Sequence, residues 1–291
     1  MVESRQFSDR PPVPVEFAPS QAHRALPVEV VERSSLLARK SAQDLALRQR
    51  VGFNLLMVCT AGQGMHSVDF EAVELSPGTC LRIHPGQVQQ FVPEPAFAAQ
   101  MVLWPIEADL IDPAAAAWFP GCGATTSWEL EPRLFARVSS AVDELRDEQR
   151  RFDGSPRRAA LMQALLHTLL LRLALEVPGS VPDPSQLPVP YLDFRRRVEE
   201  CLHERPTIRA LARDLGYSSR TLDRACQEAT GQTAKQVLDT RLALEIRRLL
   251  THTDRPLARI AADFAFDDPS NFSKFVRRHL GAVPGEVRSS A

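Results

Sequence analysis

The chain has 291 residues, of which 44% are hydrophobic and 24% are charged, and its formal net charge is −1. This composition is ordinary for a globular protein with room for two domains, and it excludes a fibrous or wholly disordered chain. No apolar run reaches the length of a membrane span, and the first residues lack the apolar core of a signal peptide. We therefore expect a cytoplasmic protein with no membrane partner.

Cysteine spacing and charge distribution add two expectations. The five cysteines show no paired spacing, so we expect reduced thiols; they are Cys59, Cys80, Cys122, Cys201 and Cys226. From Tyr191 onward 18 Lys and Arg stand against 14 Asp and Glu, whereas the remainder holds 17 against 22. A mildly basic C-terminal part suits contact with phosphate groups.

Residues 1–25 contain several prolines among polar residues and show no periodic apolar pattern. We interpret them as a flexible arm. From residue 28 to residue 105, short apolar runs are separated by Gly and Pro, which is typical of β-strands. Many short strands at close spacing favour a β-sandwich or barrel.

In residues 132–151 and 156–176 the apolar period changes to that of a helix, and Asp153, Gly154 and Pro156 separate the two stretches. This pattern predicts a helical hairpin over 132–176 that closes an N-terminal domain at 26–176. The second helix is apolar over more than one face, so one face could meet a second subunit. We expect a homodimer through this hairpin; a buried helix in a monomer is the alternative.

Residues 177–190 contain five prolines and predict a semi-rigid, extended linker. A second domain would then occupy residues 191–291. Within it, residues 207–288 contain two copies of one unit, joined by a helix expected at 233–250. Four pairs of residues define the repeat: Ala212 and Ala261, Tyr217 and Phe266, Leu222 and Phe272, Gly231 and Gly281.

Each copy has the pattern of a helix-turn-helix motif, in which a short helix with helically spaced apolar residues precedes a tight turn and a second helix. Gly216 suits a left-handed turn residue in the first copy, and Ala265 occupies that place in the second. Ser218 and Asp268 are expected N-caps of the second helices, and Pro269 follows Asp268 at the first helical position.

The last hundred residues resemble the DNA-binding domain of the AraC/XylS family of bacterial transcription regulators. The resemblance rests on the following residues: Ser218 to Arg224, Gly231-x-Thr233, the helix with Arg241, the pair Ile260 and Ala261, Phe266, Phe272-Ser273-Lys274, and the closing stretch from Gly281-Ala282-Val283-Pro284 through Arg288. The chain departs from the family at Ala265, where glycine is usual, and at Cys226, where a large apolar residue is usual.

The N-terminal domain resembles the cupin-like sensor domain that precedes many AraC-type domains. The resemblance is carried by Gly64-x-His66-x-x-Asp69-Phe70, Leu75-x-Pro77-Gly78 and Pro85-Gly86-Gln87-Val88. It implies an α+β chain: a cupin-like β-barrel with a helical hairpin, then an all-α domain with two helix-turn-helix motifs.

Metal-binding cupins carry a His-x-His pair on an early strand and a further histidine after the Pro-Gly turn. Here the early strand reads Arg48 to Phe53 and the later position is Gln89, so neither supplies an imidazole. His66 and His84 remain as weak candidates for effector binding. Two lone histidines make a poor metal site, and we expect neither a metal nor another cofactor.

The resemblance implies a sequence-specific, DNA-binding transcription regulator, of the activator type, that responds to a small-molecule effector in the barrel and is not an enzyme. Its expected partners are promoter DNA, the effector, a second copy of the chain and RNA polymerase. The expected DNA contacts are Ser219, Arg220, Thr221, Asp223, Arg224, Ser270, Asn271, Ser273, Lys274 and Arg277.

Among these residues, arginines suit guanine edges or phosphates, Asp223 could accept from cytosine, and serines suit phosphates. Two alternatives stay open at this point. One is a cupin-type isomerase or dioxygenase with an accessory DNA-binding domain. The other is a regulator whose barrel serves only dimerisation.

Overall fold

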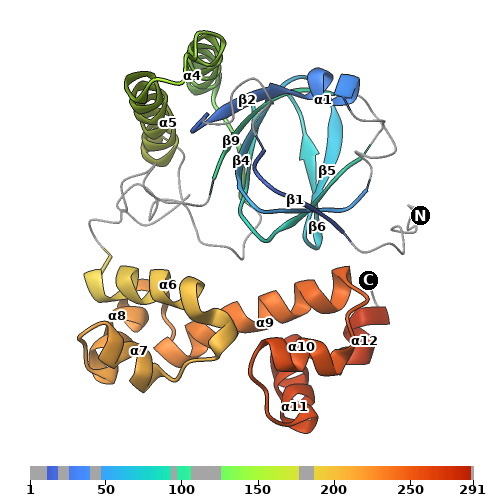
Figure 1. Ribbon diagram of the computed structural model, residues 1–291, viewed down its shortest axis with the longest axis vertical. Coiled ribbons are helices and arrows are strands. Elements are labelled where there is room, and N and C mark those ends of the chain that lie inside the picture. The colour runs from blue at the N-terminus through green and yellow to red at the C-terminus, as the bar shows by residue number, and fades with distance from the viewer. Residues whose placement is uncertain are drawn as a thin grey trace. The chain divides into compact units, whose positions relative to one another are not determined.

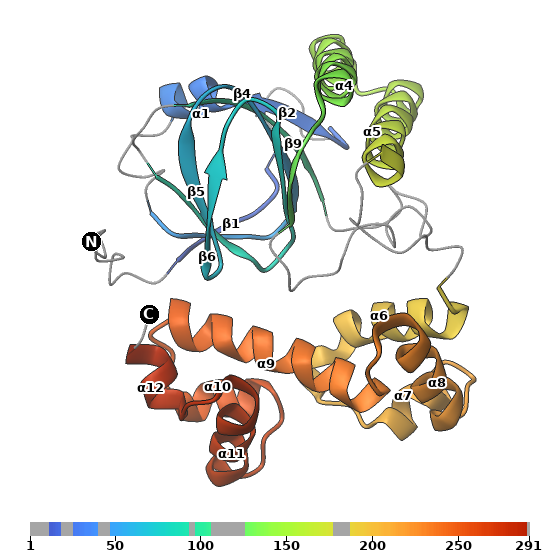
Figure 2. The same cartoon turned by 180° about the vertical axis from the view of Figure 1, so that it is seen from behind.

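The computed structural model describes residues 12–18, 26–39, 47–92, 97–105, 126–176 and 187–289. The described residues form two compact units, one within residues 12–176 and the other within residues 187–289 (Figures 1 and 2). Residues 177–186 of the expected linker lie outside the described part. The two units are described separately below.

The N-terminal unit contains two five-stranded sheets. The first sheet has, in order, β1 (Val13–Val15), β3 (Gln49–Val51), β8 (Val88–Phe91), β5 (Gly64–Val68) and β6 (Glu71–Leu75). The second has β10 (Thr126–Glu129), β7 (Thr79–Ile83), β4 (Asn54–Gly62), β9 (Phe97–Trp104) and β2 (Glu29–Glu32). Every pairing is antiparallel except that of β1 with β3.

A hydrophobic core fills the space between the two sheets, as the alternation of strand β7 illustrates. Leu81 and Ile83 belong to the core between the sheets, whereas Cys80 belongs to a second core on the outer face of its sheet. The α+β class is therefore confirmed. In the described residues no pairing joins the two sheets, so the expected barrel has the form of a sandwich.

Part of the segment expected to be a flexible arm forms strand β1. Val13 N donates to Arg48 O and Gly52 N donates to Val15 O, each at 2.8 Å. Pro14 lies between these two bonding positions at the edge of the sheet, where a proline removes no ladder hydrogen bond. A three-residue edge strand is too short to show a period in the sequence, which explains the error. Residues 1–11 and 19–25 lie outside the described part.

Two long helices, α4 (Pro132–Arg150) and α5 (Pro156–Glu176), form the hairpin that the sequence predicts; α1 (Arg33–Arg39) is a short helix after β2. The hairpin shares the second core with the outer face of the β4-containing sheet. The side chain of Gln149 on α4 bonds both backbone groups of Val30, accepting at 2.5 Å and donating at 3.2 Å. Edge strand β2 is thus covered at this point by helix α4.

Helix α5 is the one helix in the described part that is long and apolar enough to cross a membrane, with a mean hydropathy of 1.3. The expectation that no run reaches this length is therefore wrong for α5. Core helices meet the same criterion, and one face of α5 is buried in the second core. Leu161 and Leu175, however, are 44% and 75% exposed.

The C-terminal unit is entirely helical in its described residues. After α6 (Val189–Cys201) and the 3₁₀ turn η3 (Leu202–Glu204) come α7 (Ile208–Asp214), α8 (Ser219–Thr230), α9 (Ala234–His252), α10 (Leu257–Asp263), α11 (Pro269–Leu280) and α12 (Pro284–Ser289). One continuous core runs from Phe194 to Val287. Both helix-turn-helix motifs therefore share a single hydrophobic interior.

Helix α6 starts at Val189, so the end of the expected linker at 190 is too late by two residues. Pro190 falls in the first helical turn, where a missing N–H has no intrahelical partner to lose. The linking helix α9 begins with a capping box, in which Thr233 and Gln236 satisfy each other's backbone N–H groups. Of the cysteines, the four that are described are free and buried, and Cys122 lies outside the described residues.

Candidate nucleic-acid interface

The two helix-turn-helix turns begin with similar backbone geometry, and the second turn is one residue longer before its N-cap. Gly216 and Ala265 both have positive φ, of 73° and 49°. The N–H of each of these residues donates three residues back, Gly216 to Arg213 O at 3.2 Å and Ala265 to Ala262 O at 3.0 Å. The next residues, Tyr217 and Phe266, donate to Ala212 O and Ala261 O at 2.8 and 3.0 Å. The repeat in the sequence is thus a repeat in three dimensions.

Both expected N-caps are confirmed. The Ser218 hydroxyl accepts from Thr221 N at 3.0 Å and starts α8. The Asp268 carboxylate accepts from Ser270 N at 2.7 Å and starts α11, with Pro269 at the first helical position. The cap after each turn therefore fixes the residue at which the second helix begins.

Helix α8 buries Leu222, Ala225 and Cys226 and leaves Arg220 and Arg224 exposed. The two arginines are one helical turn apart, so they lie on the same face. Neither forms an ion pair with another described residue. Ser219 and Thr221 are half-buried beside them, and the Thr221 hydroxyl lies 2.8 Å from that of Ser218.

The structure gives Asp223 a contact that the sequence analysis missed. Its carboxylate accepts the backbone N–H of Ala234, the first residue of α9, at 3.0 Å. Because this bond joins α8 to the start of α9, it has a structural role in aiming α8. The expected contact of Asp223 with cytosine stays a prediction beside this structural role.

Helix α11 repeats this arrangement. It buries Phe272 and Val276. The other expected residues lie away from this buried pair: Ser270, Asn271, Lys274 and Arg277 are exposed, and Ser273 is half-buried. The structure therefore brings the predicted residues together as two separate polar faces, one on α8 and one on α11.

A hollow of about 610 Å³ lies between α7 and the beginning of α8. It is lined by Thr207, Arg209, Ala210, Ala212, Arg213, Tyr217, Ser218 and Ser219. The Arg213 side chain is 82% exposed. Arg209 and Arg213 are not among the DNA contacts expected from the sequence, although their spacing of four residues on α7 places both on one face.

Arg241, one of the residues that carry the family resemblance, has a structural place. Its guanidinium donates to the Glu199 carboxylate of α6 at 2.8 Å and approaches Glu245 at 3.4 Å. Glu245 in turn pairs at 3.2 Å with Arg248, whose side chain is fully buried. These charges tie α6 to α9 inside the domain, where they compensate one another.

In the N-terminal unit, His66 lies between the two sheets and is fully buried. Its Nε2 is 3.2 Å from Gln89 Oε1, and its ring meets that of Phe91 edge-on with centroids 4.7 Å apart. Its Nδ1 makes no hydrogen bond with a described residue. Burial lowers the pKa of His66 to about 4, so the ring is neutral at pH 7.

His84 is also buried but belongs to a turn, where its backbone N–H donates to the Gln87 side chain at 2.8 Å. Across the described residues, no group of three or more His, Cys, Asp or Glu could hold a metal ion. Neither histidine lines the hollow described next.

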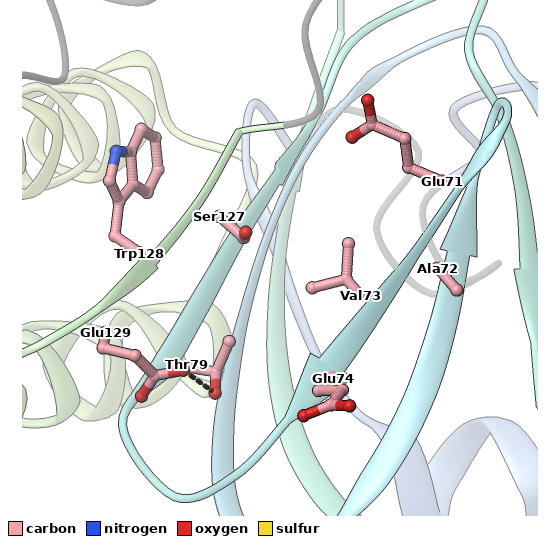
Figure 3. A pocket seen from close by; sticks show the side chains of 8 residues that line it. All are labelled: Glu71, Ala72, Val73, Glu74, Thr79, Ser127, Trp128 and Glu129. Atoms are coloured by element: carbon pink, nitrogen blue, oxygen red, sulfur yellow. Dashed lines mark hydrogen bonds between the residues drawn. The ribbon is translucent and has the colours of Figure 1, made fainter.

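A second hollow of about 270 Å³ lies between edge strands β6 and β10 of the two sheets (Figure 3). Its lining consists of Glu71, Ala72, Val73, Glu74, Thr79, Ser127, Trp128 and Glu129. The Thr79 hydroxyl donates to the Glu129 carboxylate at 2.6 Å. The indole of Trp128 points away from the other lining side chains and packs against the second core, which the helical hairpin shares.

Residues 36–165 match the family described as the AraC-like ligand binding domain, and residues 211–290 match a helix-turn-helix domain. The chain is 33% identical over 91 residues to the HTH-type transcriptional activator RhaS of Escherichia fergusonii, covering 31% of this chain and 33% of that protein. It is 39% identical over 88 residues to the ornithine utilization regulator of Pseudomonas aeruginosa, covering 29% and 25%. The matched parts thus span a third or less of these relatives.

A longer match joins the chain to the HTH-type transcriptional activator RhaR of Mannheimia succiniciproducens, with 20% identity over 243 residues, 82% of this chain and 86% of that protein. Among solved structures, ToxT of Vibrio cholerae O395 aligns with a TM-score of 0.42 and 11% identity over 82% of this chain and 89% of that one. The DNA-binding domain of AdpA, solved with a target DNA, aligns with a TM-score of 0.33 and 31% identity, covering 35% and 91%.

Proposed function

We propose, from the premise that the chain belongs to the AraC family of transcription regulators, that it binds promoter DNA through α8 and α11. The observation that carries the proposal is the repeated turn. Two similar turns, of which the second is one residue longer before its N-cap, present two helices, and each helix buries its apolar face and exposes polar and basic side chains. That is the arrangement in which a helix-turn-helix motif places its second helix in the major groove.

On α8, Arg220 and Arg224 are the residues proposed to contact base edges, because an exposed guanidinium can bond guanine with two donors. On α11, Asn271, Lys274 and Arg277 take the corresponding place. The hydroxyl residues at the helix starts are proposed to contact phosphates; they are Ser219, Thr221, Ser270 and Ser273.

The hollow beside α8 supports a second set of phosphate contacts. Arg209 and Arg213 line it from α7, and the start of α8 lines it from the other side. A DNA strand that runs past α8 in the major groove would cross this hollow, since the first helix of such a motif lies over the backbone. We include both arginines in the interface as contacts that add affinity and salt dependence.

Helix α9 has 19 residues and is therefore about 28 Å long at about 1.5 Å per residue. Successive major grooves on one face of DNA are about 34 Å apart. One subunit would thus contact two short blocks about one helical turn apart, with some DNA bending where the protein spacing is shorter.

The N-terminal domain is proposed to bind a small-molecule effector, because it matches the AraC-like ligand binding domain. We further propose that the protein is a cytoplasmic activator, as RhaS and RhaR are named activators, and that it contacts RNA polymerase. A homodimer through α5 is supported by its exposed Leu161 and Leu175. The relatives are regulators, and we propose no enzymatic activity.

The test is selection of binding sites from a random duplex DNA library by the full chain, followed by footprinting of the enriched sequences. We expect two protected blocks about one helical turn apart for each subunit. The double variant Arg220→Ala/Arg224→Ala should lose the first block, while Arg133→Ala, at an exposed arginine of α4, serves as the control. Enrichment of no sequence would refute the proposal.

A further inference from the structure

A short segment between α6 and α7 contacts the turn of the second motif directly. The ring of His203, in η3, stacks on that of Phe264, with centroids 4.8 Å apart and planes 13° from parallel. The guanidinium carbon of Arg205 lies 3.8 Å from the centroid of Phe266. Phe264 and Phe266 flank Ala265 and are buried. The residues that lead into the first motif therefore hold the turn of the second; we call His203 and Arg205 with these two rings the clasp.

The backbone on both sides of the clasp is strained. Three non-glycine residues of the described chain have positive φ, and two of them, Arg205 and Ala265, lie here, each with φ of 49°. Left-handed backbone is unfavourable for a residue with a Cβ and persists where surrounding contacts impose it. The stacked rings and the cation over the Phe266 ring are contacts of this kind.

The clasp connects α11 with the start of α7, the first helix of the first motif. Phe266 meets Phe272 and Phe275 of α11 edge-on, with centroids 5.3 and 5.5 Å apart. On the other side, Thr207 caps α7 two residues after Arg205. α7 and α10 lie on the same side of α9 in both views (Figures 1 and 2). A change in the placement of α11 relative to α8 would therefore disturb the clasp as well as α9.

We propose that His203 and Arg205 are positioning residues that fix the separation and relative rotation of α8 and α11, and so restrict the regulator to one spacing between its two DNA blocks. The inference rests on the proposed function. A single helix can bend or turn about its axis, but a second connection between the two motifs opposes both movements. One added base pair rotates and shifts the second block, so a rigid pair of helices rejects it.

The experiment measures spacing tolerance in the full chain. The parent protein first selects its two-block site from random DNA, and duplexes are then made with one base pair added or removed between the blocks. Parent, His203→Ala, Arg205→Ala, Arg205→Lys and the control Arg133→Ala are titrated on each duplex. Thermal unfolding of each variant reports folding separately.

We expect Arg205→Ala to bind the original duplex within about twofold of the parent, and to lose roughly two- to fivefold of the discrimination against altered spacing, the size of an exposed cation–π contact. His203→Ala should act in the same direction. Arg205→Lys, which keeps a cation over Phe266, should retain most of the discrimination, and Arg133→Ala should retain all of it. Base preference within each block should stay unchanged in every variant.

Arg205→Gly separates contact from strain, because it removes the guanidinium and also relieves the left-handed backbone. We expect Arg205→Gly to lose spacing discrimination to the same extent as Arg205→Ala, and to have a higher melting temperature than Arg205→Ala. Discrimination equal to the parent's in both Arg205→Ala and His203→Ala would overturn the clasp and leave the proposed function standing. A parent protein that enriches no two-block DNA would overturn the proposed function, and the clasp with it.

Discussion

Exchange of the residues at the two equivalent turns provides a direct energetic test of the repeat. Ala265 has φ of 49° and Gly216 has φ of 73°, with matching backbone hydrogen bonds. Left-handed backbone disfavours an alanine by about 1–2 kcal/mol. Glycine gains freedom in the unfolded chain, which offsets about 0.4–1 kcal/mol of that difference. Ala265→Gly should therefore stabilise the folded domain by about 0.5–1 kcal/mol.

Gly216→Ala is the matched control of opposite sign. A Cβ added at Gly216 would meet no atom within 4 Å, so the substitution changes backbone energetics alone. It should destabilise the domain by a similar amount. A change of 1 kcal/mol corresponds to about 4–8 °C in melting temperature for a domain of 60–100 residues.

The assay is thermal and urea unfolding of residues 187–291 and of the full chain, with circular dichroism as the signal. Ala265→Gly should raise the melting temperature and Gly216→Ala should lower it. The double variant should have a melting temperature close to that of the parent. A shift of both single variants in the same direction would refute the reasoning, because it would mean that contacts of the side chain, and not the shared backbone conformation, govern the two turns.

Four further predictions follow from the interface and the N-terminal unit. Arg224→Ala should weaken DNA binding by about 1–3 kcal/mol and relax base preference at one position of the first block, and Lys274→Ala should act on the second block; parent-like binding of a full operator-variant library by both would contradict the interface. The purified protein should carry no stoichiometric iron, zinc or manganese by elemental analysis, and one-to-one metal with function lost on chelation would contradict this. Burial lowers the pKa of His66 from its ordinary 6.5 to about 4, so the unfolded chain takes up the proton at higher pH than the folded chain, and the N-terminal unit should lose stability as pH falls from about 6.5 to about 4. His66→Gln should remove this part of the pH dependence of the unfolding free energy. The same pH dependence in parent and variant would show that His66 does not cause it. Leu161→Glu with Leu175→Glu should convert a dimer to a monomer in sedimentation, and a parent protein that is already monomeric would exclude the α5 interface.

Local signals explain how much of the C-terminal unit could be predicted. The N-caps at Ser218 and Asp268 and the left-handed turn at Gly216 depend on residues within a few positions of one another, and all three are found. The repeat extended the same prediction to Ala265, although alanine carries no left-handed preference of its own. Because the two motifs are repeats, the glycine of the first turn predicts the backbone conformation of the second turn, which has no glycine.

Contacts between distant segments could not be predicted in this way. The bond from Asp223 to the start of α9 depends on how α8 and α9 pack. The place of Cys226, which is fully buried where a large side chain was expected, also depends on packing. The strand pattern around His66 predicted alternation but not which face is buried, since a one-residue change of register exchanges the two faces. Strand β1 could not be predicted either, because its three residues become a strand only by pairing with the distant strand β3.

The departure at Ala265 and the clasp have a common physical basis. A glycine at this turn would adopt the left-handed conformation without help and would also permit others. An alanine reaches that conformation only in a narrow range of φ and ψ, and its flanking rings, Phe264 and Phe266, are the ones held by His203 and Arg205. The turn is therefore less favourable than its counterpart but better defined. The turn at Ala265 thus costs some folding stability, and it lies where the placement of α11 relative to α8 is fixed. A rigid turn at this place favours a protein that binds two DNA blocks at one spacing.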